Sequence, residues 1–414
     1  MNIALLGWIT FLCLNISIPT LGMDTSVKQN TVPEPVNWDG FRGQKQGISS
    51  WNNAPTSWDV KSGKGVLWKT PLKMRGASSP VVFGKQVYLS EADDNERAVL
   101  AFDIATGKQL WRHVVVDGGK GSELPTATGD TGFAAPTQVC DADGVYTLFG
   151  TGDLAAFTPD GKPKWQIFLK RPENMYGHAS SPCLINGKIY IQYDQTTNAR
   201  VLAINASDGK IIWETPRERG PSWSSPMIVP GANGKPLFVV NAIGVITAYD
   251  LVSGKEAWNV EGVTGDLAPS LTYADGCIYA VNEGSKLVCY KIGEKPEKRW
   301  EYTDNLAEIS TPVVVNGLLF MASGKEKLVC LDAVIGKENW VQQGIPCFAS
   351  LVASGPRVYA FGREGKVMIF DAKPVYNLIG ACDMGGDAVD TTPAFGDGRM
   401  YIRSKENLWC VGEK

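Results

Sequence analysis

A short junction of small residues and proline recurs along this chain and constrains its fold more than any other feature. Seven intervals separate Pro80 from Pro393, so the repeat is about 45 residues long, as in the blades of a β-propeller. The junction has eight copies, and one of them, Ala349-Ser350-Leu351, is degenerate because it lacks the proline. The other copies are Ser78-Ser79-Pro80, Ala134-Ala135-Pro136, Ser180-Ser181-Pro182, Ser224-Ser225-Pro226, Ala268-Pro269, Thr311-Pro312 and Thr391-Thr392-Pro393.

Each junction is followed by the same order of short segments. Two apolar runs flank a glycine-containing turn, as in PVVFGKQVYLS (80–90) and PCLINGKIYIQ (182–192). A third run leads through another turn to a tryptophan, as in AFDIATGKQLW (101–111) and AYDLVSGKEAW (248–258). Short β-branched runs joined by Gly turns predict strands in hairpins, and four strands per repeat predict a propeller blade. The expected fold is all-β: an eight-bladed β-propeller of four-stranded antiparallel blades.

The motif Ala-x-Asp-x-x-x-Gly-Lys-x-x-Trp resembles the pyrroloquinoline-quinone-like repeat. This repeat occurs in quinoprotein dehydrogenases and in the periplasmic propeller lipoprotein that assists outer-membrane β-barrel assembly. The resemblance covers roughly residues 60 to 412 and implies an eight-bladed propeller of an exported protein. In addition, Trp38-Asp39-Gly40-Phe41-Arg42-Gly43 resembles an opening motif of secreted bacterial members.

In most repeats a tryptophan follows the turn after the third apolar run. We expect each of these rings to pack between neighbouring blades. Blade seven departs from this pattern, because Leu378 and Ile379 stand where the tryptophan is expected. The interface that follows this blade should therefore be the least well specified. The expected structural tryptophans are Trp68, Trp111, Trp165, Trp213, Trp258, Trp300 and Trp340.

The last repeat lacks an outer strand, because the chain stops soon after Trp409. The segment 65–69, which contains Trp68, has the pattern of the missing strand. Pairing the two ends of the propeller would remove an open sheet edge. The expected organisation is therefore a signal peptide over 1–22, an N-terminal extension over 23–59 and a propeller over 60–414.

The first 22 residues are apolar from Ile3 to Ile18 and end in small residues, as secretory signal peptides do. No Lys or Arg precedes the apolar run, so an uncleaved membrane anchor is an alternative. Either alternative predicts export to the periplasm or cell envelope, with membrane contact only through this segment if it stays uncleaved.

Nine cysteines leave eight after signal removal, yet their positions argue against a disulfide framework. Cys289, Cys330 and Cys410 occupy a third-strand position that is alanine in other repeats, which predicts small buried core sites. The chain has no C-x-x-C and only two histidines, His113 and His178. We therefore expect mostly free thiols and no metal site of Cys and His ligands.

The loops that precede the junctions should surround the mouth of the central channel, where propellers commonly bind ligands. These loops carry a mixture of charged, aromatic and imidazole side chains that could orient a small ligand or a peptide. Phe133 and Phe348 also stand at these positions. The candidate ligand-binding residues are Arg75, His178, Trp223, Asp266, Glu308 and Asp390, and no catalytic residue is predicted.

The first repeat is longer than the others and contains two unusual segments. Residues 91–96 are rich in carboxylates but lack the ordered spacing of a calcium loop, so a solvated loop is expected. The glycine-rich segment 117–132 has no strand-to-helix context for a phosphate site, and we expect a mobile flap near the channel rim.

A formal net charge of −3 gives the chain no overall field that would draw it to nucleic acid. The favoured function is a non-enzymatic, monomeric binding or scaffolding protein that takes a protein or small molecule at the propeller face, with a role in envelope protein assembly. The alternatives are a quinoprotein oxidoreductase dependent on pyrroloquinoline quinone and a carbohydrate-binding envelope protein. The family resemblance implies an adjacent cysteine pair, a calcium site and a catalytic Asp in the enzymes; this chain has no adjacent cysteines, so no cofactor is expected.

Overall fold

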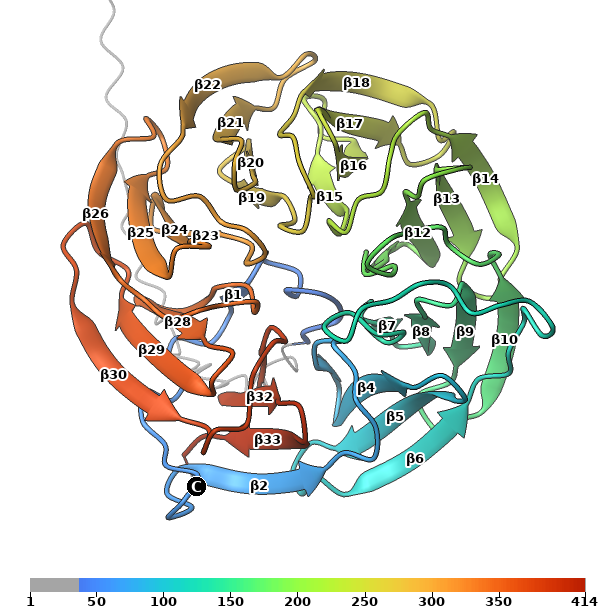
Figure 1. The fold of residues 1–414 in the computed structure, drawn as a ribbon, viewed down its shortest axis with the longest axis horizontal. Coiled ribbons are helices and arrows are strands. Elements are labelled where there is room, and N and C mark those ends of the chain that lie inside the picture. Colours follow the sequence, from blue (N-terminus) through green and yellow to red (C-terminus); the bar gives the residue numbers. More distant parts are fainter. Residues whose placement is uncertain (1–36, 414) are drawn as a thin grey trace, which may run out of the picture. The chain divides into compact units, whose positions relative to one another are not determined.

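Eight antiparallel sheets surround a central axis in the computed structural model, which describes residues 37–413 (Figure 1). Seven sheets have four strands and one has a fifth, short strand. The prediction of an eight-bladed β-propeller is therefore confirmed. The expected signal peptide, 1–22, lies outside the described residues. Within 37–413, no helix is long and apolar enough to cross a membrane.

Each of the first four blades is a meander that runs from an inner to an outer strand. Blade 1 has β3 (Val81–Phe83), β4 (Gln86–Ala92), β5 (Arg97–Asp103) and β6 (Gln109–Val114). Blade 2 has β7 (Val139–Asp141), β8 (Gly144–Leu148), β9 (Asp153–Phe157) and β10 (Pro163–Phe168). Blade 3 has β11 (Cys183–Ile185), β12 (Lys188–Tyr193), β13 (Arg200–Asn205) and β14 (Ile211–Pro216). Blade 4 has β15 (Met227–Pro230), β16 (Pro236–Ala242), β17 (Val245–Asp250) and β18 (Glu256–Glu261).

The later blades repeat this order, with strands from the N-terminal part added to two of them. Blade 5 has β19 (Thr272–Ala274), β20 (Cys277–Val281), β21 (Leu287–Lys291) and β22 (Glu297–Tyr302). Blade 6 has β23 (Val313–Val315), β24 (Leu318–Ala322), β25 (Lys327–Asp332) and β26 (Glu338–Gln343). Blade 7 has β27 (Val352–Ser354), β28 (Arg357–Phe361), β29 (Lys366–Asp371) and β30 (Leu378–Asp383), with β1 (Ile48–Ser49) at its inner edge. Blade 8 has β31 (Ala394–Gly396), β32 (Arg399–Arg403), β33 (Asn407–Val411) and the outer strand β2 (Val66–Pro71).

Strand β2 closes the ring, as the sequence predicts. It pairs antiparallel with β33, and Trp68 lies opposite Cys410 in the register. In Figure 1 the blue β2 lies outside the red β33, so the beginning and the end of the propeller share blade 8. The edge of β33 is therefore covered within the chain itself.

The extension crosses the end of the channel opposite the blade-to-blade loops. Trp38 forms a β-bridge with Val82 of blade 1, while β1 pairs in parallel with β27 of blade 7. Between these points Arg42 is fully buried and donates to Thr272 Oγ1 of blade 5 and to the carbonyl of Pro312 ahead of blade 6. The extension thus contacts blades on opposite sides of the ring.

Six of the seven predicted tryptophans donate their indole N–H to a carbonyl in the next blade, and five of them also lie against a glycine there. Trp213, for example, donates to the carbonyl of Leu251 at 3.1 Å, and a Cβ added to Gly254 would lie 2.5 Å from its ring. Trp68, Trp111, Trp165 and Trp300 are placed likewise over Gly107, Gly161, Gly209 and Gly336. Trp340 donates to Lys373 but packs on Tyr376, and the buried Trp258 has no partner for its N–H among the described residues.

The missing tryptophan of blade 7 is compensated by the extension. Gly380, rather than Leu378 or Ile379, occupies the tryptophan position, because it stands opposite Ile369 in β29 as Trp340 stands opposite Cys330 in β25. The carbonyl oxygen of Thr56 lies where a side chain at 380 would begin. Trp58 stacks on Phe361 of the same blade at 6.3 Å between ring centroids and is almost fully buried. The outer part of blade 7 is therefore covered by a segment that precedes the propeller in sequence.

All eight cysteines within 37–413 are free thiols, in agreement with the expectation of mostly free thiols that rested on Cys289, Cys330 and Cys410. Burial raises the pKa of the thiols of Cys330, Cys347 and Cys410 to about 12 in each case. These thiols are therefore protonated and poorly nucleophilic near neutral pH.

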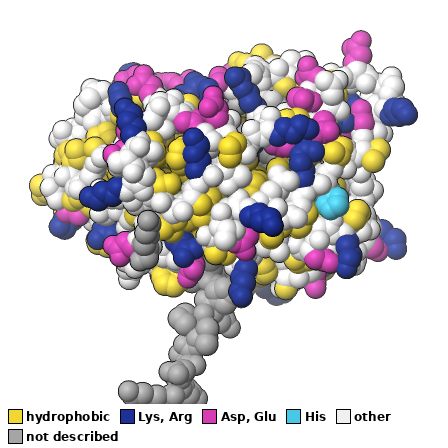
Figure 2. Space-filling view, turned by 90° about the horizontal axis from the view of Figure 1, so that it is seen from below, with side chains coloured by type: hydrophobic (Ala, Val, Ile, Leu, Met, Phe, Trp, Pro, Cys, Tyr) yellow, Lys and Arg dark blue, Asp and Glu magenta, His cyan; other side chains and the backbone are white. Residues whose placement is uncertain are grey.

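Charges of both signs are mixed over the outer wall of the ring. Figure 2 shows Lys and Arg side chains interspersed with Asp and Glu side chains on the face in view. No block of one sign covers that face, in agreement with the small net charge.

Candidate functional site

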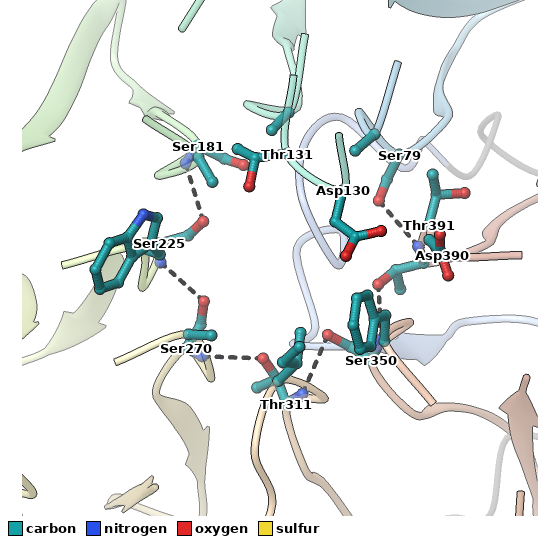
Figure 3. Close-up of a pocket in the computed structure, with 18 of the residues that line it drawn as sticks. Ser79, Asp130, Thr131, Ser181, Ser225, Ser270, Thr311, Ser350, Asp390 and Thr391 are labelled. Carbon is teal, nitrogen blue, oxygen red and sulfur yellow. Dashed lines mark hydrogen bonds between the residues drawn. The ribbon is translucent and has the colours of Figure 1, made fainter. Parts of the chain in front are cut away.

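The blade-to-blade loops surround a cavity of about 520 Å³ at one end of the channel, which we call the well. Figure 3 shows its lining residues arranged around an open centre. Phe41 of the extension lines both the well and a second hollow of about 330 Å³ on the opposite side. Phe41 therefore forms part of the floor of the well, and the buried Arg42 lies beyond it.

A closed ring of eight hydroxyl side chains, which we call the hydroxyl girdle, lines the well. Each blade contributes one Ser or Thr, whose backbone N–H donates to the hydroxyl oxygen of the girdle residue in the next blade, and Figure 3 draws most of these bonds. The N···O distances are 2.9 Å for Ser79 to Thr137, 3.0 Å for Thr137 to Ser181, 2.9 Å for Ser181 to Ser225, 2.8 Å for Ser225 to Ser270, 3.0 Å for Ser270 to Thr311, 3.4 Å for Thr311 to Ser350, 3.0 Å for Ser350 to Thr392 and 3.1 Å for Thr392 to Ser79.

The girdle satisfies eight backbone N–H groups that no strand can pair. They lie just before the inner strands, where buried donors need side-chain partners. All eight side chains are at least nine-tenths buried, and no acceptor for their own protons is found among the described residues. Because a hydroxyl has one proton and two lone pairs, each girdle residue still has a donor and an acceptor to offer to the well.

Two of the four carboxylates that line the well are paired with cations. Arg363 donates to Asp390 at 3.0 Å and to Asp130 at 2.7 Å, and its guanidinium lies over the Phe348 ring. Lys405 adds a longer contact to Asp390. Asp130 belongs to the glycine-rich segment 117–132, which reaches from blade 1 to the Arg363 turn of blade 7. The C-terminal part of this segment, with Thr128, Asp130 and Thr131, therefore lies at the rim, where the flap was expected.

The other two carboxylates, Asp266 and Glu308, lie on adjacent loops that lead into blades 5 and 6. Both are exposed, and neither forms an ion pair within residues 37–413. The Tyr176 hydroxyl donates to Asp266 at 3.2 Å, and the charge of this carboxylate raises the pKa of Tyr176. The Tyr176 ring packs on Trp223 at 5.0 Å, so aromatic surface adjoins the unpaired carboxylates.

Four of the six predicted ligand-binding residues line the well: Trp223, Asp266, Glu308 and Asp390. Arg75 instead lines an adjoining hollow of about 60 Å³, together with Asp130 and Lys405. His178 is fully buried beside Tyr193, with 4.8 Å between the ring centroids, and is not among the lining residues. Burial lowers the pKa of His178 to about 4.

The hydroxyl girdle was not anticipated from the sequence. In six blades the girdle residue precedes the proline or, in blade 7, Leu351. In blades 2 and 5 it follows the proline, as Thr137 and Ser270, so aligning the repeats on proline places these two blades out of register by two residues. The distance from each hydroxyl residue to its first strand is the signal that would have found all eight.

A quinone cofactor does not fit the residues of the well. Pyrroloquinoline quinone carries several carboxylates, whereas the lining residues include four carboxylates and no Lys, Arg or His. Two cations at the rim, Arg363 and Lys405, already contact Asp390. Over the described range 37–413, no group of three His, Cys, Asp or Glu side chains is placed to hold a metal ion.

Sequence comparison finds similarity to proteins with two kinds of name, outer-membrane assembly factors and a hydrolase. Outer membrane protein assembly factor BamB of Moranella endobia is 24% identical over 289 residues, which is 64% of this chain and 70% of that protein. BamB of Escherichia coli is 24% identical over 54% of this chain and 60% of its own length, less than two thirds. The tetrathionate hydrolase of Acidithiobacillus ferrooxidans is 27% identical over 44% of this chain and 33% of its length.

Solved structures share the fold at lower sequence identity. BamB from Moraxella catarrhalis is 14% identical with a TM-score of 0.62, covering 84% of this chain and 97% of that one. A europium-containing methanol dehydrogenase is 12% identical with a TM-score of 0.72, covering 92% and 99%. The sequence profile described as outer membrane protein assembly factor BamB matches residues 48–195 and 177–374, more than half of the chain. The chain therefore belongs to this family of pyrroloquinoline-quinone-like β-propeller repeats.

Proposed function

We propose that this protein is an exported, non-enzymatic scaffold of the cell envelope that holds a segment of another protein in the well. The similarity to BamB supports an envelope location and a role in protein assembly. The similarity to a methanol dehydrogenase concerns the fold and does not extend the proposal to oxidation.

One observation carries the proposal: the well combines a pre-formed polar ring with a floor that belongs to the same chain. The hydroxyl girdle offers donors and acceptors on all sides, which suits the alternating N–H and C=O groups of an extended peptide. Phe41 of the extension lies between the well and the hollow on the opposite side, so a bound segment would rest against it. A pre-formed site of this kind loses little conformational entropy on binding.

The lining chemistry favours binding over catalysis. No residue that lines the well is His, Cys or Lys, so the girdle hydroxyls have no imidazole or amine beside them to remove a proton. The buried His178 has a pKa of about 4 and lies outside the lining.

The test compares ligand classes on the intact protein and on a variant with a filled well. Ala268 lines the well, so Ala268→Trp should occupy the cavity. We expect extended peptides to bind wild-type protein in calorimetry and to lose binding to Ala268→Trp, while oligosaccharides bind neither. Binding of oligosaccharides alone would support the carbohydrate alternative and contradict the proposal.

A second assay addresses the oxidoreductase alternative. Apo protein is titrated with pyrroloquinoline quinone and calcium, and dye-linked oxidation of alcohols and aldoses is then measured. We expect neither submicromolar binding nor turnover. Turnover that disappears in Asp266→Ala or Asp390→Ala would overturn the scaffold proposal.

A further inference from the structure

We propose that the well selects a lysine side chain of the bound segment and places its ammonium group between Asp266 and Glu308 above the hydroxyl girdle. This inference rests on the proposed function and deepens it by naming the chemistry of the partner. Three properties of the well lead to it.

The first property is an excess of negative charge that the chain leaves uncompensated on one side. Four carboxylates and no cationic side chain line the well. Arg363 and Lys405 compensate Asp130 and Asp390, whereas Asp266 and Glu308 form no ion pair within the described residues. The two unpaired groups lie on neighbouring loops that both line the well, so their negative charges add at a cation placed between the two loops.

The second property is the buried hydroxyl girdle beneath these carboxylates. An ammonium group that leaves water needs both a charge partner and acceptors for its three protons. The girdle residues that follow these carboxylates in the chain, Ser270 and Thr311, each accept one backbone N–H and keep a second lone pair. Carboxylates above and hydroxyl oxygens below thus meet both requirements of an ammonium group.

The third property is the aromatic wall next to Asp266. Tyr176 and Trp223 pack against one another and line the well. Their rings can cover the methylene chain of lysine and can also attract its charge through their π faces. A norleucine side chain would gain only the apolar part of this contact.

The decisive experiment uses capped pentapeptides, acetyl-Gly-Ala-X-Ala-Gly-amide, in which X is lysine, norleucine or glutamate. Calorimetry on the whole exported protein gives Kd at low and at high salt. We expect the lysine peptide to bind at least about tenfold more tightly than the norleucine peptide, as charge-assisted hydrogen bonds imply. This preference should decrease as salt rises, and the glutamate peptide should bind most weakly.

Variants assign the preference to the two carboxylates. The double variant Asp266→Asn with Glu308→Gln should bind lysine and norleucine peptides equally. Glu294→Gln is the matched control, because Glu294 is exposed in the turn between β21 and β22, at the other end of blade 5. It should keep the wild-type preference. Near-ultraviolet circular dichroism confirms that each variant is folded.

The outcomes separate this inference from the proposed function. Equal binding of lysine and norleucine peptides to wild-type protein would overturn the inference and leave the peptide scaffold in place. Binding of putrescine without binding of any peptide would overturn both, because the ligand would be a free amine. A preference that survives in the double variant would overturn the assignment to Asp266 and Glu308.

Discussion

Serine and threonine alternate freely around the hydroxyl girdle because only their shared hydroxyl oxygen is required. Ser270 Oγ accepts the buried N–H of Ser225 at 2.8 Å. Ser270→Ala leaves that donor without a partner and should cost about 1–3 kcal/mol of unfolding free energy. Ser270→Thr restores the acceptor and should remain close to wild type. Urea denaturation of the two variants measures the difference, and equal losses would show that the hydroxyl is not what stabilises the ring.

The buried imidazole of His178 makes stability depend on pH. Burial lowers its pKa to about 4 in the folded state, whereas an unfolded histidine titrates near about 6.5. The unfolded chain therefore binds more protons between these values. The contribution of His178 is complete above about pH 6.5 and is lost as the pH falls towards about 4, by up to about 3 kcal/mol.

His178→Phe should remove this component of the pH dependence. We expect the unfolding free energy of the variant to change less between pH 7 and pH 4.5 than that of wild-type protein. An identical pH response of His178→Phe and wild type would contradict the assignment.

At the scale of the blade, a tryptophan over a glycine is the contact that joins neighbours. Gly254 and Gly187 have almost the same positive φ, 68° and 67°, but only Gly254 lies under a tryptophan. Gly254→Ala adds a clash with Trp213 to the backbone strain that Gly187→Ala also suffers. We expect Gly254→Ala to lose about 1–3 kcal/mol more than Gly187→Ala in urea denaturation. Equal losses would mean that the backbone conformation, rather than the tryptophan, requires glycine.

The blades were predictable because each repeats a local pattern of strand, turn and tryptophan. The number of blades and the free thiols follow from that pattern. The closure by β2 follows because the last repeat lacks an outer strand and the segment around Trp68 has the pattern of one. The cover of blade 7 was not predictable, because Trp58 meets Phe361 across 303 positions of sequence, as far apart as Arg357 and Ala54. Likewise, Asp130 and Arg363 form an ion pair although 233 positions of sequence separate them.

The candidate site was partly predictable for a related reason. Loops before the inner strands must meet at one end of any propeller, so Trp223, Asp266, Glu308 and Asp390 could be placed there from sequence order. Whether a side chain of such a loop points into the well or into the protein depends on the backbone conformation of the loop, which the sequence order does not give. His178 turns into the protein beside Tyr193, and Arg75 faces a neighbouring hollow.

At the scale of the whole molecule, two truncations separate the roles of the floor and of ring closure. A chain that begins at residue 60 loses Phe41, Arg42, β1 and Trp58 but keeps β2. A chain that begins at residue 73 also loses β2 and Trp68, which exposes the edge of β33. The shorter chain should be less stable by at least about 3 kcal/mol, the cost of removing one buried tryptophan, and should aggregate. Thermal melts with size-exclusion chromatography measure both effects, and equal melting temperatures would contradict the closure role.

The eight N–H to hydroxyl bonds of the girdle all point the same way around the axis, from each blade to the next, and most of them are drawn in Figure 3. Vectors that follow one another around a closed circle cancel, so the bond dipoles of the girdle give no net dipole across the well. The girdle therefore fixes the shape of the site without setting the sign of the charge that the site presents to a ligand. The carboxylates on the rim loops set that charge. A substitution at the rim can therefore change the charge of the ligand that the well binds, while the girdle beneath it keeps its structure.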